Sequence, residues 1–192
     1  MSFSQVSDII IINDIRLSLL SYPLESYLNS LYPLIKFDKQ TSDCWRGYQA
    51  TWVIYKDILY LENVYGNIKG EKADIFTLFD LATIEKEVKA IWFTGILKVP
   101  VSPIVYIKSH VQKYRKELVI KIENGNVIQM ICKGYDIDED TFDNPPMIEY
   151  EISKKEMEQE VVNYKIMKEE QGDQNRFIFY KYDSKSLFVD ED

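Results

Sequence analysis

The sequence predicts an α+β fold in which a twisted antiparallel sheet of hairpins packs against two or three helices, followed by a β-rich, acidic C-terminal extension. Three observations favour this class. Alternating apolar residues flank short polar dipeptides at three places, a pattern typical of β-hairpins. Two segments carry apolar residues at helical spacing. Of the 192 residues, 46% are hydrophobic, which is ample for a core.

The hairpins are expected near residues 9–19, 46–61 and 117–132. Each contains β-branched and aromatic residues, which suit a pleated and half-buried surface. The connecting dipeptides are Asn13-Asp14, Lys56-Asp57 and Asn124-Gly125. Asn-Gly is the strongest of these turn signals, so the third hairpin is the clearest.

The central hairpin is rich in aromatic residues, and alternation assigns its side chains to two faces. Counting by twos from Arg46 places four further residues on the same, mostly apolar face: Tyr48, Ala50, Trp52 and Ile54. One interpretation makes Trp45 and Trp52 core aromatics, with Arg46 snorkelling or paired with a carboxylate. In the other, Arg46 lies beside the aromatics to hold an anion or an acidic group of a partner.

Helices are predicted near residues 22–31 and 81–93. Ser21 is the candidate N-cap of the first helix, and Pro23 suits its first turn. In the second segment, charged residues lie opposite a stripe of four apolar residues at helical spacing. The four apolar residues are Ile84, Val88, Ile91 and Trp92.

A boundary is expected near residues 135–146, where a charge run is followed by Asn144-Pro145-Pro146. The sequence therefore predicts an α+β body over 1–135 and an acidic extension over 136–192 that packs on the body. Within the extension, strands are expected at 147–152 and 176–182, and helix-like spacing runs through the polar segment 154–170.

The net charge of −8 is distributed unevenly. Residues 1–135 hold 16 Lys/Arg and 14 Asp/Glu, a net charge of +2, whereas residues 136–192 hold 7 and 17, a net charge of −10. Such a field repels nucleic-acid phosphates and attracts cationic partners. We therefore expect no nucleic-acid binding, and a partner that is a cationic protein.

Several function classes lack their usual residues. The two cysteines are too few for a disulfide framework, and with the single His110 they provide no metal-ligand spacing, so neither a metal nor a cofactor is expected. Free thiols and the absence of a signal-peptide pattern in residues 1–8 favour the cytoplasm. No apolar run approaches the roughly 20 residues that span a bilayer. No catalytic residues are predicted.

A set of short motifs in residues 9–135 carries a resemblance. Its most specific parts are Cys44-Trp45-Arg46-Gly47-Tyr48 with Thr51-Trp52, and Trp92-Phe93-Thr94-Gly95 with Pro100. These motifs resemble a family of small uncharacterised bacterial proteins, which implies no particular activity. The family's usual Glu after the Thr-Trp pair is Val53 here, and the acidic extension is an addition to the pattern.

Two functions of different class follow from these observations. The first is a non-enzymatic, cytoplasmic interaction module, similar in profile to bacterial immunity proteins that neutralise a basic toxin or effector. Its candidate binding residues are Arg46, Tyr48, Trp52, Asp136, Asp138, Asp140, Glu169 and Glu170. The alternative is a small-molecule-binding or enzymatic domain with a pocket lined by Arg46, Tyr48, Trp52 and Trp92.

Overall fold

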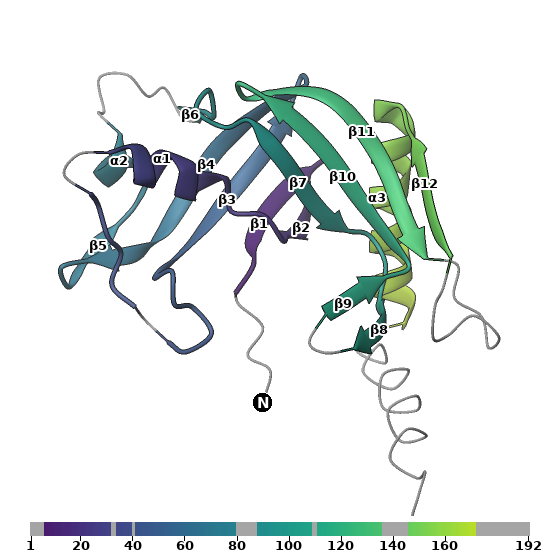
Figure 1. Cartoon of the computed structure of the whole chain (residues 1–192), viewed down its shortest axis with the longest axis horizontal. Coiled ribbons are helices and arrows are strands. Elements are labelled where there is room, and N and C mark those ends of the chain that lie inside the picture. Colours follow the sequence, from purple (N-terminus) through teal and green to yellow (C-terminus); the bar gives the residue numbers. More distant parts are fainter. Residues whose placement is uncertain are drawn as a thin grey trace, which may run out of the picture.

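A ten-stranded, strongly curved sheet forms the framework of the protein in a computed structural model, which describes residues 6–31, 34–39, 41–79, 88–108, 111–135 and 146–171 (Figure 1). Its main path runs in this order: β2 (Ile15–Leu19), β1 (Asp8–Ile12), β3 (Tyr48–Tyr55), β4 (Ile58–Ile68), β11 (Asn126–Tyr135), β10 (Lys116–Glu123) and β7 (Gly95–Pro100).

Shorter strands extend this path at two points. Two pair with β4, namely β5 (Glu71–Ala73) and β6 (Val88–Lys89), and β12 (Met147–Glu151) pairs with β11. A separate two-stranded sheet consists of β8 (Ile104–Lys108) and β9 (Val111–Tyr114). The three described helices are α1 (Pro23–Ser30), α2 (Ile75–Leu78) and α3 (Lys154–Gln171). The α+β class predicted from the sequence is confirmed.

The three predicted hairpins are present as β1–β2, β3–β4 and β10–β11. Both residues of each connecting dipeptide have positive φ, from 48° at Lys56 to 76° at Gly125. This left-handed geometry is that of the tight turns that match the twist of antiparallel strands. The prediction of an antiparallel sheet needs one correction, because β1 and β3 pair in parallel.

The two ends of the main path, β2 and β7, come into contact. Leu20 N donates to Lys98 O at 2.9 Å just beyond the end of β2, and the Ser21 hydroxyl oxygen accepts from Lys98 N at 3.0 Å. The prediction that Ser21 is the N-cap of α1 is therefore wrong. Tyr22 occupies the N-cap position and makes no side-chain capping hydrogen bond. The Ser21 hydroxyl oxygen accepts from the backbone of β7 instead.

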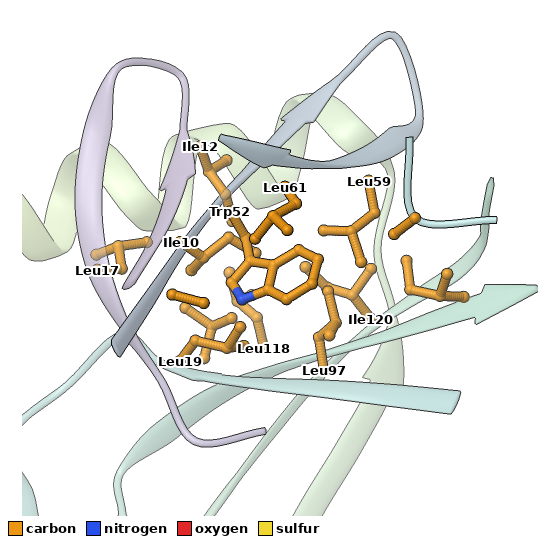
Figure 2. Packing of buried hydrophobic residues seen from close by; sticks show 14 of the residues in the cluster. Ile10, Ile12, Leu17, Leu19, Trp52, Leu59, Leu61, Leu97, Leu118 and Ile120 are labelled. Carbon is orange, nitrogen blue, oxygen red and sulfur yellow. The ribbon is translucent and has the colours of Figure 1, made fainter. Parts of the chain in front are cut away.

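Trp52 lies at the centre of the core and is fully buried (Figure 2). Aliphatic side chains from five other strands surround its indole ring: Ile10, Ile12, Leu17, Leu19, Leu59, Leu61, Leu97, Leu118 and Ile120. The predicted face of β3 is borne out by the burial of Tyr48, Ala50 and Trp52. Trp45, in contrast, is 58% exposed and is not a core residue, because it lies in the turn that leads into β3.

The helix predicted over 81–93 is wrong at its described end. Residues 80–87 lie outside the described part of the chain, but Val88–Lys89 form β6, paired with Tyr60 and Leu61 of β4. Ile91, which belonged to the predicted apolar stripe, is 63% exposed in the turn that follows. Hydrogen bonding to the edge of β4 therefore overrides the helical spacing at this end.

The described part of the C-terminal extension continues the sheet. Strand β12 pairs with β11 over Ile131–Tyr135, and the 18-residue helix α3 follows it. Helix rather than strand thus predominates in this part of the extension. The strand expected at 176–182 lies outside the described residues.

Candidate functional site

The most buried ionic group in the described structure is the pair formed by Asp8 and Arg46. Arg46 Nη1 lies 3.1 Å from Asp8 Oδ1, and both side chains are at most 2% exposed. Arg46 Nη2 donates to the Val6 carbonyl at 2.6 Å. Both terminal guanidinium nitrogens are therefore engaged inside the protein.

Asp8 accepts two more hydrogen bonds from β3. Ala50 N donates to Asp8 Oδ1 at 3.2 Å, and Trp52 Nε1 donates to Asp8 Oδ2 at 3.1 Å. Burial raises the pKa of the Asp8 carboxyl, and the Arg46 charge together with these donors opposes the rise. The parallel pairing of β1 with β3 creates this geometry, because it places the start of β1 beside Ala50.

Two tyrosines contact the Arg46 guanidinium. Arg46 Cζ lies 3.5 Å from the Tyr22 ring centroid and 4.9 Å from that of Tyr48, which are cation–π distances. Burial, reinforced by the Asp8 charge, raises the pKa of the Tyr48 hydroxyl, although Arg46 opposes this. The predicted residues Arg46, Tyr48 and Trp52 thus meet around Asp8.

Trp92, the fourth residue of the predicted pocket, packs in a different aromatic cluster. Its ring centroid lies 4.8 Å from that of Tyr27 and 5.5 Å from that of Phe79, and its Nε1 donates to the Pro23 carbonyl at 3.3 Å. These contacts join α1 to the segments after α2 and β6. They give Trp92 a packing role distinct from that of the Arg46 group.

The Asp8–Arg46 group acts as an interior clamp. It connects the chain before β1 to β1, to the turn before β3 and to β3 itself. Only 7% of the Arg46 residue is exposed when its backbone is included. Sequence reasoning anticipated a carboxylate partner for Arg46 but did not identify Asp8. The available signal was an acidic residue at the start of an otherwise all-isoleucine strand, where a buried carboxylate needs a partner.

A second candidate site is the outer surface of the C-terminal extension. Residues 146–171 contain seven acidic and four basic side chains. The predicted residues Glu169 and Glu170 lie exposed in the last turn of α3, and Glu169 Oε1 is 3.9 Å from Lys165 Nζ. Asp136, Asp138 and Asp140 lie outside the described residues.

Helix α3 is fixed to the rest of the structure by its inner side. Met157 and Val161 are at most 1% exposed and belong to the main core. Lys116 Nζ, at the start of β10, lies 2.8 and 2.9 Å from the two carboxylate oxygens of Glu160. The acidic side chains of α3 are therefore presented on a firmly attached element.

Strand β12 has both of its faces exposed. Its three apolar side chains, Met147, Ile148 and Tyr150, are 55%, 46% and 46% exposed, and they are interspersed with Glu149 and Glu151. An exposed strand of mixed acidic and apolar character is unusual inside a folded domain, because large apolar side chains are normally covered. Sequence reasoning placed the strand but gave it no binding role.

Comparisons with known proteins assign no identity. No protein-family model matches the chain, and no curated protein and no solved structure matches it. Among the residues that the structure describes, no group of three or more His, Cys, Asp or Glu side chains can hold a metal ion. The described helices include none with the length and apolar character needed to cross a bilayer.

Proposed function

We propose that this chain is a non-enzymatic, cytoplasmic protein-interaction module that binds a cationic protein, in the manner of bacterial immunity proteins that cover a basic toxin or effector. The observation that carries the proposal is the acidic surplus on β12 and α3, an exposed surface anchored to the core by Met157 and Val161. An acidic surface raises the rate of association with a positively charged partner, and because this surface is anchored to the core it does not have to fold before it binds.

The internal polar group supports the same conclusion. A guanidinium whose two terminal nitrogens already bind Asp8 and Val6 offers little to an incoming metabolite. The exposed charges of the extension remain open to another macromolecule. The proposal therefore assigns binding to the surface and structural support to the Asp8–Arg46 clamp.

The test measures association with a purified cationic protein recovered with this chain from its own cells. The test variant reverses three acids of α3, Glu158→Lys, Glu169→Lys and Glu170→Lys. Its matched control reverses three acids elsewhere with the same change in net charge, at the exposed positions Asp14, Glu71 and Glu123.

We expect the α3 variant to lower the association rate constant at low salt by roughly tenfold or more, and the control to lower it much less. High salt should remove the difference. Equal effects of the two variants would show that only total charge matters and would contradict a specific acidic surface. The absence of any cationic partner that binds the purified chain would overturn the proposal itself.

A further inference from the structure

Among the residues that the structure describes, strand β12 has an open edge. In the described part of the chain, its one strand partner is β11, and it lies off the main path of the sheet (Figure 1). An open edge presents unpaired backbone N–H and C=O groups on which another strand can form. Such an edge is a docking site only if its chemistry favours one kind of partner.

The register shows which residues face this open edge. Ile152 N donates to Met130 O at 3.0 Å, so these two residues form a hydrogen-bonded pair of the antiparallel ladder. Hydrogen-bonded and non-hydrogen-bonded residue pairs alternate along an antiparallel ladder. Tyr150 and Ile148 therefore also direct their backbone N–H and C=O groups toward β11. Glu149 and Glu151 then direct their backbone N–H and C=O groups away from β11, to the open edge.

The side chains of β12 add a pattern of charge to this edge. Glu149 and Glu151 lie on one face, across from Lys133 and Ile131 of β11, and Ile148 and Tyr150 lie on the other. Opposite charges across a strand pair are stabilising, and like charges are destabilising. The complementary strand therefore has Lys or Arg opposite the two glutamates and apolar residues between them.

A second copy of the chain does not meet this requirement. In an antiparallel pair of two β12 strands centred on Glu149, that residue faces its own copy, and a shift of two residues makes it face Glu151 or Met147 instead. Because β12 contains no Lys or Arg, none of these registers places a cation opposite the glutamates. The charge pattern thus disfavours self-association and selects a cationic partner.

We propose that β12 is the docking strand for a partner segment of alternating basic and apolar residues, which adds to the sheet as an extra strand. This inference rests on the proposed function and specifies how the cationic partner is recognised. Backbone hydrogen bonds supply affinity in this mode of recognition, and the alternating side chains supply specificity.

The probe for the test is a fluorescent heptapeptide of alternating lysine and valine that begins and ends with lysine. Its control is the same peptide N-methylated on the two central lysines, which keeps every charge but removes the backbone donors that would face β12. We expect the full chain to bind the parent peptide, and the N-methylated peptide to bind roughly tenfold more weakly or worse, as expected for the loss of two backbone hydrogen bonds.

Two variants of the protein, rather than of the peptide, test the same edge. Glu149→Pro and Glu149→Val remove the same charge, but only the proline also removes the outward N–H, and proline is tolerated on edge strands. We expect Glu149→Val to weaken parent-peptide binding a few-fold, in a salt-dependent manner, and Glu149→Pro to weaken it by roughly a further tenfold. Circular dichroism verifies that both variants are folded.

Equal binding of the two peptides by the full wild-type chain would overturn the inference, even if Glu149→Pro failed to fold. Concentration-dependent dimerisation that is lost in Glu149→Pro would also overturn it, because the edge would then serve a second copy. If a cationic protein binds and responds to the α3 reversals while the two peptides bind equally, the proposed function stands and the strand-docking inference fails. If no cationic protein and neither peptide binds, both fail.

Discussion

Asp8 shows how one residue can organise contacts between distant parts of the chain. Its carboxylate accepts from Arg46, Ala50 and Trp52, which are 38 to 44 positions away in the sequence. A buried charge is costly unless it is paired and hydrogen-bonded, so this group specifies how β1 and β3 lie relative to each other.

At this scale we predict that Asp8→Asn lowers the free energy of unfolding by roughly 3–5 kcal/mol, because it leaves the Arg46 charge buried without a counter-ion. Urea unfolding followed by tryptophan fluorescence measures the loss. The double variant Asp8→Asn with Arg46→Met should recover part of it, since the unpaired charge is then absent. A loss below about 1 kcal/mol in the single variant would mean that the pair is not a clamp.

Among the elements, the β10–β11 hairpin is held at its turn by two other segments. Gly125 N donates to Phe93 O at 3.0 Å, and Gly125 O accepts from Leu59 N at 2.8 Å. Gly125 has a φ of +76°, and a Cβ at this position would lie 2.8 Å from the Ala90 carbonyl oxygen. The turn needs glycine both for its backbone conformation and for the close approach of residue 90.

Gly70 offers a matched control for this turn, because it has a φ of +82° but open space, with no neighbouring atom within 4 Å, where a Cβ would lie. We predict that Gly70→Ala costs about 1–2 kcal/mol from backbone strain alone. Gly125→Ala should cost at least about 1 kcal/mol more, because the Ala90 backbone must also move. Thermal unfolding of the two variants compares them, and equal losses would rule out a role for the contact with Ala90.

The start of α3 is stabilised by a reciprocal cap. Glu156 Oε2 accepts from Ser153 N and from the Ser153 hydroxyl, both at 2.7 Å, and Glu156 N donates to the Ser153 hydroxyl oxygen at 3.3 Å. These hydrogen bonds lower the pKa of the Glu156 carboxyl below its usual 4.5. The ionised form is therefore the one that caps the helix.

This cap predicts a pH dependence with a definite sign. Because the pKa is lower in the folded state, the unfolded chain binds more protons, so stability rises with pH in this range. The contribution is complete above pH 4.5 and is lost as the pH falls through the lowered folded-state pKa. Hydrogen exchange of the Ser153 amide should lose protection over this acidic window. Glu156→Gln, which keeps a capping amide but does not titrate, should lack the step; an identical profile in that variant would contradict the assignment.

For the whole molecule, the position of α3 makes the described part of the extension contribute to the core. Met157 is 1% exposed and Val161 is fully buried among residues contributed by the sheet. We predict that Met157→Ala lowers the free energy of unfolding by roughly 2–5 kcal/mol. Tryptophan fluorescence and far-ultraviolet circular dichroism should report the same lowered midpoint, because body and extension unfold together. Separate transitions in the two signals would instead show that α3 unfolds on its own.

Local chemistry explains why much of the fold was predictable. The dipeptides Asn13-Asp14, Lys56-Asp57 and Asn124-Gly125 form the tight turns that the sequence predicted, and alternation placed Trp52 on the mostly apolar face, which the structure shows to be buried in the core. The helix predicted over 81–93 was wrong at its C-terminal end, because the spacing of apolar residues carries no information about the pairing of Val88 and Lys89 with β4.

The sequence by itself determined the α+β class, the hairpins, α1 and the acidity of the extension, because each follows from neighbouring residues or from composition. Only the tertiary structure decided that β1 lies parallel to β3, that Asp8 is the partner of Arg46, and that β12 has an open edge within the described part of the chain. These features depend on which distant segments meet. Many pairings of similar apolar strands satisfy the same local pattern, and the packing of the whole chain selects among them.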